Sequence, residues 1–175
     1  MQTNNVFLIG FMGVGKSTMA RMLAEELHMN LIEMDETIEA EQGMTIQEIF
    51  EKQGENGFRD IESAFVERIS QGQNMVVSCG GGAVLRKQNV ENMKKSGKII
   101  FLTATPETIF ERVRYSTNRP LLNGNMNVEY IAQLMERRKS IYESAADVII
   151  ITDGKSEAEM LQDLLVVVQN EKSGK

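Results

Sequence analysis

The sequence predicts an α/β protein, a three-layer α/β/α sandwich built on a five-stranded parallel sheet. Five short apolar runs alternate along the chain with longer stretches in which apolar residues recur at helical spacing. The short runs are apolar almost throughout, which is typical of parallel strands that helices cover on both faces. A glycine-rich turn follows the first run and leads directly into a helical stretch, so the chain begins with a strand–turn–helix unit.

The elements of the first half follow from these patterns. Met19, Leu23 and Leu27 recur at helical spacing after the turn. Residues 45–48 (TIQE) form a capping-box pattern, in which the Thr and Glu side chains bind free backbone amides at a helix start. The expected elements are a strand at Asn5–Ile9, a helix at Lys16–Leu27, a strand at 31–32, helices at 45–50 and 57–69, and strands at Met75–Ser78 and 98–102.

The second half continues the alternation. Thr105 followed by Pro106 places a capping residue before a proline at the first helical position, which opens a helix. Residues 116–127 are rich in Asn and Gly and break the periodicity, so we expect a long loop of the kind that often forms a lid. A helix at 128–142 and a strand at Val148–Ile151 come next. The last helix follows Ser156, and the residues expected on its buried face are Ala158, Leu161, Leu165 and Val168.

Composition limits the class of protein. The chain has 175 residues, of which 42% are hydrophobic and 25% charged, and a net charge of −6. These values exclude a disordered chain and fit a single domain over residues 1–175, which we expect to be monomeric. No apolar run approaches the ~20 residues of a membrane span, and the N-terminus does not resemble a signal peptide, so a cytoplasmic location without a membrane partner is expected. The acidic balance argues against nucleic-acid binding.

Cysteine and histidine usage narrows the chemistry further. The only cysteine is Cys79, which cannot form an internal disulfide and fits a reducing compartment. The only histidine is His28, so a metal site with several histidines is excluded.

Residues 10–17 (GFMGVGKS) match the phosphate-loop pattern G-x-x-x-x-G-K-[ST] at every fixed position. Glycines let successive backbone amides curl around phosphate oxygens, and the start of the following helix adds positive potential. Lys16 can reach the β- and γ-phosphates, and the Ser17 hydroxyl can bind Mg²⁺. A plain strand-to-helix turn is the alternative, but strand, loop, Lys-Ser pair and helix coincide here. The candidate residues for binding a nucleoside triphosphate are Gly13, Val14, Gly15, Lys16 and Ser17 of this stretch and Thr18 directly after it.

Two carboxylates, Glu33 and Asp35, follow the second predicted strand. Ligands of parallel sheets bind beyond the carboxyl ends of the strands, so residues at such positions are candidates for chemistry. Asp35 can accept the proton of an acceptor hydroxyl or orient a magnesium-bound water. An aspartate is equally suited to cap a helix that starts near Glu36, and sequence position leaves both interpretations open.

Three glycines, Gly80, Gly81 and Gly82, follow the third predicted strand. Most P-loop ATPases and GTPases carry an aspartate for magnesium at this point, and this chain has none. Residues without side chains let a ligand or a phosphate approach the backbone closely, and a simple turn rarely needs three of them. Cys79, just before the glycines, is interpreted as a small buried filler.

Arginines beside apolar helix faces are further candidates. Arg138 lies at the edge of the apolar stripe of the 128–142 helix, and Arg59 borders the apolar face of the 57–69 helix. A charge directed inward is costly unless it is paired, so each arginine either forms a salt bridge or binds an anion. Two such arginines can grip one carboxylate. Arg119 lies in the long loop, from which a mobile arginine can reach a transferring phosphate.

These motifs, in this order, resemble the shikimate kinase family, small P-loop kinases related in fold to nucleoside monophosphate kinases. The resemblance runs from about residue 6 to the last helix. Its most particular pieces are Phe-Arg-x-x-Glu at 58–62, the triple glycine with Ala-Val at 80–84, and Arg-Pro-Leu-Leu at 119–122. The resemblance implies a P-loop kinase fold with a mobile lid at about residues 113–127.

The resemblance also implies a reaction and a set of roles. The reaction transfers the γ-phosphoryl group of ATP to the 3-hydroxyl of shikimate, a step of aromatic amino acid biosynthesis, with Mg²⁺ as cofactor. The implied catalytic residues are Asp35 as base and Lys16 and Arg119, which stabilise charge on the phosphates. The implied shikimate-binding residues are Asp35, Arg59, Gly80, Gly81, Gly82 and Arg138. The implied ATP contacts outside the phosphate loop are Arg112, Arg119 and Asp153.

One position departs from the family pattern. The family usually has Asp-x-Asp after the second strand, where the first aspartate helps to order magnesium through water. This chain has Glu33 at that position, one methylene longer, and keeps Asp35 at the other. The expected metal ligand is therefore Ser17, with Glu33 as a candidate ligand through water.

Other functions are compatible with parts of this pattern. Gluconate kinases and nucleoside monophosphate kinases share the architecture, and a gluconate kinase also recognises a carboxylate, but the triple glycine and the Phe-Arg motif favour shikimate. A nucleotide-driven switch is disfavoured because the chain has no Asn-Lys-x-Asp motif. A binding protein without activity is disfavoured because the chain retains Lys16, Asp35, Arg59, Arg119 and Arg138.

Overall fold

The computed structural model describes residues 5–115 and 127–170. The elements occur in this order: β1 (Asn5–Ile9), α1 (Lys16–Leu27), β2 (Asn30–Glu33), α2 (Met34–Gln42), α3 (Ile46–Ile69), β3 (Met75–Ser78), α4 (Lys87–Ser96), β4 (Gly97–Thr103), α5 (Pro106–Val113), α6 (Val128–Ala145), β5 (Val148–Ile151) and α7 (Glu157–Gln169). Within these ranges, five strands form one sheet in the order β2-β3-β1-β4-β5, and every pair is parallel. The predicted five-stranded parallel sheet is confirmed.

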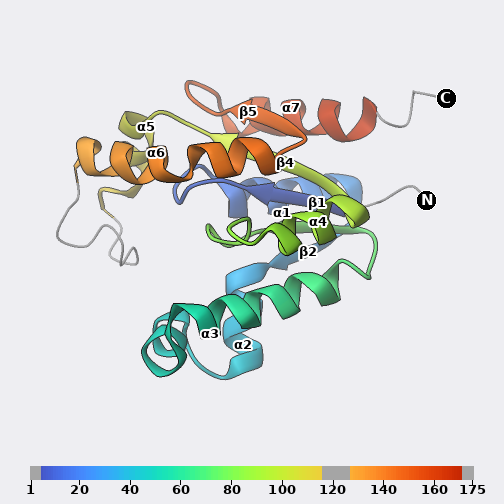
Figure 1. The fold of residues 1–175 in the computed structure, drawn as a ribbon. Coiled ribbons are helices and arrows are strands. Elements are labelled where there is room, and N and C mark those ends of the chain that lie inside the picture. The colour runs from blue at the N-terminus through green and yellow to red at the C-terminus, as the bar shows by residue number, and fades with distance from the viewer. Residues whose placement is uncertain (1–4, 116–126, 171–175) are drawn as a thin grey trace.

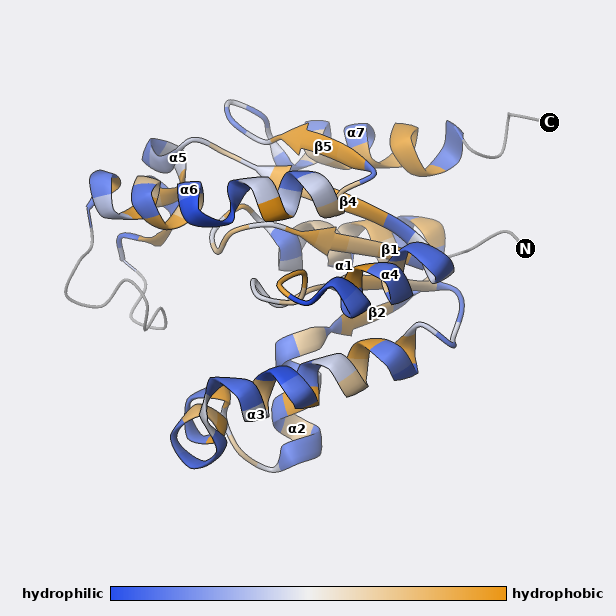
Figure 2. Ribbon diagram, viewed as in Figure 1, coloured by the Kyte–Doolittle hydropathy of each residue, from blue (hydrophilic) through white to orange (hydrophobic). Residues whose placement is uncertain are grey.

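The central strand β1 is apolar on both faces, which allows helices to cover the sheet on both sides. Phe7 lies in register between Val77 of β3 and Ile99 of β4. Leu8 packs into a core with α1 and α7, whereas Phe7 and Ile9 pack into a second core with α3 and α4. Burying a large apolar side chain contributes about 1.5–3 kcal/mol, so these two cores hold the three layers together. Figure 1 shows the helices on both sides of the sheet, and Figure 2 shows the strands as apolar bands between them.

The third helix, α3, contains the break that the sequence predicts. Gly54 has φ 72° and ψ 178°, outside the helical region, so the two expected helices meet at this glycine. The second of them lies in the same core as Cys79, at the end of β3. Burial raises the pKa of the Cys79 thiol, which confirms its interpretation as a buried filler.

Two helices differ from the expectation. The sequence analysis did not predict α4, because this helix is mostly polar and only two of its residues are buried. In α7, Met160, Leu164 and Leu165 are buried, whereas Ala158 is exposed. The expected burial of Ala158 is therefore wrong. No helix in the described ranges is both long and apolar enough to cross a membrane.

Candidate active site

The phosphate loop, residues 10–17, joins β1 to α1 at the carboxyl edge of the sheet. Gly15 lies at the N-cap of α1 with φ 99°, a conformation that residues with side chains rarely adopt. Gly13 packs against α5, where a Cβ atom would come within 2.6 Å of a Val113 methyl carbon. The glycines therefore allow both the tight curl of the loop and its contact with α5.

Lys16 folds back over this loop. Its Nζ atom donates hydrogen bonds to the carbonyl oxygens of Gly10 (2.7 Å) and Phe11 (3.2 Å). Because α1 begins at Lys16, the amides of its first turn have no partner within the helix. Together, the lysine and these amides form a site for phosphate oxygens.

Oxygen ligands for a metal gather beside the phosphate loop. The Ser17 hydroxyl donates a hydrogen bond to Glu33 Oε2 (3.0 Å), and its oxygen lies 3.4 Å from Ser78 Oγ at the end of β3. Hydroxyl and carboxylate oxygens are ligands that Mg²⁺ prefers. The longer side chain of Glu33 therefore still reaches the hydroxyl of the expected metal ligand. The sequence analysis did not identify Ser78.

A pocket of about 420 Å³ opens beside the phosphate loop. It is lined by Val14, Gly15, Thr18 and Arg112, which are all expected ATP-binding residues, and by Lys155 and Glu157, which the sequence analysis missed. The Arg112 guanidinium donates to the carbonyl oxygens of Gly13 (3.3 Å) and Val14 (3.2 Å) and to the Thr152 hydroxyl (3.2 Å). Arg112 thus joins the phosphate loop to the turn after β5.

Asp153 lies in that turn, but its carboxylate faces α5. It accepts hydrogen bonds from the Thr105 amide, the Thr105 hydroxyl and the Thr108 hydroxyl at 2.5–3.1 Å. Partial burial acts to raise the pKa of Asp153, but the hydrogen bonds from Thr108 and Thr105 outweigh it and hold the pKa below its usual range. The side chain is absent from the lining of the pocket just described. The contact between Asp153 and ATP stays a prediction.

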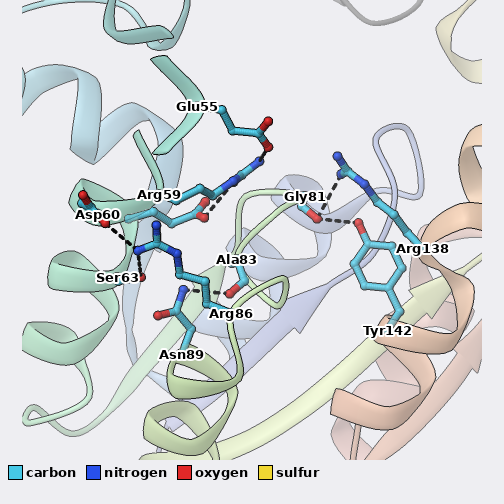
Figure 3. Close-up of polar contacts among 11 residues, drawn as sticks. Glu55, Arg59, Asp60, Ser63, Gly81, Ala83, Arg86, Asn89, Arg138 and Tyr142 are labelled. Atoms are coloured by element: carbon cyan, nitrogen blue, oxygen red, sulfur yellow. Dashed lines mark hydrogen bonds and ion pairs between the residues drawn. The ribbon is translucent and has the colours of Figure 1, made fainter. Parts of the chain in front are cut away.

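The glycine turn, residues 80–82, is where the expected acceptor-binding residues meet. A Cβ atom on the first glycine would lie 2.6 Å from Asp35 Oδ1, and one on the second would lie 3.5 Å from Arg138 Nη1. A Cβ atom on the third would overlap the guanidinium of Arg59. Figure 3 shows Arg59 and Arg138 on opposite sides of the turn that carries Gly81. Side chains from α2, α3 and α6 thus converge on the backbone of the three glycines.

Asp35 lies in the first turn of α2, which begins at Met34 with Glu33 at the N-cap. The interpretation of Asp35 as the cap of a helix starting near Glu36 is therefore wrong. Within the described ranges, no hydrogen bond engages its carboxylate. Part of the side chain is open to solvent, but the surrounding protein displaces enough water to raise the pKa of Asp35, against the opposite effect of Lys16. A carboxylate with a raised pKa suits a general base.

Arg59 is paired with a buried carboxylate that the sequence analysis did not select. Glu62 is 1% exposed, and its Oε1 atom accepts a hydrogen bond from Arg59 Nη1 at 2.8 Å. Desolvation raises the pKa of Glu62, against the lowering effect of Arg59. Among the described residues, Arg59 Nε and Glu62 Oε2 are buried without a hydrogen-bond partner. Since buried polar atoms normally have hydrogen-bond partners, this pair can form further hydrogen bonds beside the glycine turn.

Arg138 and Tyr142 lie one turn apart on α6 and reach the same carbonyl oxygen. The Tyr142 hydroxyl donates to the Gly81 oxygen at 2.6 Å, and Arg138 Nη1 donates to it at 3.3 Å. The ring of Tyr142 stacks on Phe101, with ring centroids 5.0 Å apart. The long bond holds the Arg138 guanidinium weakly, so it can bind an anion near the turn.

Arg119 lies outside the described residues, as does most of the expected lid at about 113–127. The contribution of Arg119 to catalysis and the lid itself stay predictions.

Comparisons with known proteins agree with this geometry. A family model described as "Shikimate kinase" matches residues 12–169. A shikimate kinase from Persephonella marina is 42% identical over 161 residues, which cover 92% of this chain and 96% of the relative. The structure of a shikimate kinase from Acinetobacter baumannii in complex with shikimate has a TM-score of 0.89 at 32% identity and covers 98% of this chain and 96% of its own. A gluconokinase from Sinorhizobium meliloti has a TM-score of 0.62 at 18% identity, covering 98% and 94%, and shares the fold alone.

The matched residues include most of the phosphate loop, the whole glycine turn and both arginines beside it. Since each of these matches to a shikimate kinase spans nearly the full length of this chain and of the relative, the chain belongs to the shikimate kinase family of ATP-dependent kinases.

Proposed function

We propose that the protein transfers the γ-phosphoryl group of ATP to the 3-hydroxyl of shikimate, giving shikimate 3-phosphate and ADP. The convergence of Asp35, Arg59 and Arg138 on one glycine turn carries this proposal. Two guanidinium groups suit the single carboxylate of shikimate. The carboxylate of Asp35, which accepts no hydrogen bond from the described residues, suits its hydroxyl. Gluconate as acceptor is supported only by a neighbour that shares the fold.

In this proposal, shikimate is positioned before any bond changes. Arg59 and Arg138 bind its carboxylate, and the amides of the glycine turn contact its oxygens. The 3-hydroxyl then lies against Asp35, which accepts the proton as the hydroxyl oxygen attacks the γ-phosphorus. The raised pKa of Asp35 makes it a stronger base for this transfer. Lys16, joined by Arg119, stabilises the charge that develops on the phosphates.

ATP binds in the same proposal with its phosphates on the phosphate loop and its base in the pocket lined by Arg112. Ser17 would hold Mg²⁺ directly and Glu33 through water. When bound there, the metal ion would neutralise negative charge on the phosphates of ATP. We further infer a single kinase domain over residues 1–175 with a lid at about 113–127, acting as a cytoplasmic monomer without a nucleic-acid partner. Length, composition and family membership support these points.

A coupled ADP-release assay tests the proposed function. Shikimate, gluconate and nucleoside monophosphates are compared as acceptors, each with and without Mg²⁺. We expect rapid ADP release with shikimate and Mg²⁺ and only background release with the other acceptors or without the metal. Equal ADP release without any acceptor would indicate a nucleotide-driven switch, and faster release with gluconate would indicate the alternative kinase.

A further inference from the structure

The four carbonyl groups of residues 80–83 are all engaged within the protein. The amides of Ala83 and Leu85 donate to the carbonyl oxygens of Gly80 and Gly82, each at 3.0 Å. Side chains bind the other two oxygens. By contrast, no hydrogen bond between described residues uses the amides of the three glycines. In this turn the carbonyl oxygens accept hydrogen bonds from the protein, whereas the glycine amides donate none to described residues. The amides therefore present partial positive charge, which suits the oxygens of a ligand.

The two side chains that hold this turn are Tyr142 of α6 and Asn89 of α4. The Tyr142 hydroxyl donates to the Gly81 oxygen at 2.6 Å, and Asn89 Nδ2 donates to the Ala83 oxygen at 3.0 Å. Figure 3 shows them reaching the turn from opposite sides. Donors from two different helices therefore bind the backbone of the turn at Gly81 and the backbone just after it at Ala83.

Packing alone does not account for these two side chains. Asn89 is 1% exposed, and its Oδ1 atom has no hydrogen-bond partner in the part of the chain that the structure describes. Burying a side-chain amide whose oxygen forms no hydrogen bond is unfavourable, and an apolar side chain would fill the core at lower cost. The contribution that an apolar side chain could not make is the hydrogen bond from Asn89 Nδ2 to the Ala83 oxygen. For Tyr142, a phenylalanine ring would fill the same space against Phe101. Burial raises the pKa of Tyr142, which keeps its hydroxyl protonated as a donor.

Tyr142 also affects the arginine that shares its carbonyl. The Arg138 bond to the Gly81 oxygen is long at 3.3 Å, while the Tyr142 bond is short. Without the tyrosine hydroxyl, this oxygen would attract the guanidinium more strongly and draw it away from an incoming carboxylate. The hydroxyl therefore leaves Arg138 available to the ligand.

We infer that Tyr142 and Asn89 are positioning residues for the acceptor, which orient the amides of the glycine turn toward shikimate and leave Arg138 available for its carboxylate. Neither side chain needs to touch the reacting atoms. The inference rests on the proposed function, because it concerns how this site holds shikimate.

Steady-state kinetics of Tyr142→Phe and Asn89→Leu test this role, with shikimate and ATP varied separately. We expect the KM for shikimate to rise roughly threefold to tenfold in each variant, the effect of one hydrogen bond, while the KM for ATP stays unchanged. Tyr130→Phe on α6 and Asn92→Leu on α4 make the same chemical changes on the same helices. These two controls should leave both KM values unchanged.

An unchanged KM for shikimate in either folded variant overturns the inference for that residue. An equal rise in the KM values for shikimate and ATP also overturns it, because a general structural defect would produce that result. If Asn89→Leu does not fold, Tyr142→Phe decides the question, since its ring packing is kept. An inactive wild-type enzyme contradicts the proposed function, whereas an active wild type with unaffected variants contradicts only the positioning role.

Discussion

At the residue scale, Asp35, the proposed general base, lowers the stability of the fold. Desolvation raises its pKa in the folded protein, so the folded protein holds a proton there more tightly than the unfolded chain does. Between the ordinary pKa of aspartate and the raised value, the stability of the fold decreases as pH rises. Above the raised pKa, the ionised carboxylate therefore destabilises the fold, yet it is the form that can accept a proton.

Asp35→Asn should separate these two effects. We expect kcat to fall roughly 10²–10⁴-fold, the usual contribution of a general base. The melting temperature at neutral pH should stay the same or rise, and any gain should disappear below the ordinary pKa of aspartate, where both states are protonated. Assays and thermal melts across pH check this, with Glu36→Gln on the same helix as a control. Near-normal turnover of Asp35→Asn would leave Asp35 with a binding role only.

Sequence patterns singled out the charged side chains that meet at the glycine turn, but not all their partners. Arg59 and Arg138 were found because charges at the edges of apolar helix faces are visible in a periodic pattern. Glu62 was noted only as the end of the Phe-Arg-x-x-Glu motif and was given no role, although its spacing of three residues from Arg59 on one helix was a usable signal. Lys155 and Glu157 carried no such signal, because the orientation of a turn toward a pocket depends on tertiary packing.

At the element scale, the glycine turn is constrained by the side chains that pack on it. The third glycine lies directly under the Arg59 guanidinium, which is only 11% exposed and is paired with Glu62. The second glycine has ordinary contacts, the nearest at 3.5 Å. The two positions should therefore differ sharply in their tolerance of a methyl group.

Gly82→Ala should impair shikimate use more than Gly81→Ala. The new methyl group at position 82 must displace Arg59, so we expect a roughly 10- to 100-fold rise in the KM for shikimate, as for a lost charged hydrogen bond. Gly81→Ala should have a smaller effect, and neither change should alter the KM for ATP. Parallel titrations of both substrates measure this, and equal or reversed effects of the two variants would be inconsistent with the packing of Arg59.

Among the elements, those with strong apolar periodicity were predictable and those without it were not. The strands and α1 follow from apolar runs and spacing, and the break in α3 from the change of pattern near Gly54. By contrast, α4 is held by few buried residues, and the buried stripe of α7 includes Met160 instead of Ala158. In α7 the apolar residues 160, 161 and 164–168 are spread around most of the helix, so their spacing alone does not decide which face is buried.

At the scale of the whole molecule, the parallel sheet brings distant segments to one edge. Ser17, Glu33 and Ser78 follow or end three neighbouring strands and meet within hydrogen-bond distance. The sequence predicted the strands and this edge, because parallel strands share their carboxyl ends. It did not predict the strand order β2-β3-β1-β4-β5, which depends on pairing between residues far apart in the chain.

The expected lid at about residues 113–127 can be tested in the intact protein. We expect hydrogen exchange in this segment to slow when shikimate and a non-hydrolysable ATP analogue are both bound, because closure would protect its amides. Exchange in the central strand β1 serves as an internal reference. Protection that stays the same with and without both ligands would remove the lid assignment.

Recognition of the acceptor carboxylate by Arg59 and Arg138 is tested most directly by calorimetry with shikimate and its methyl ester, which lacks the negative charge. Both ligands are titrated into the wild type, into Arg138→Met, and into Arg137→Met as a matched control on the same helix. We predict that the wild type and the control bind shikimate much more tightly than the ester, and that Arg138→Met loses most of this preference. Equal affinity of the wild type for acid and ester, or an undiminished preference in Arg138→Met, would contradict this mode of binding.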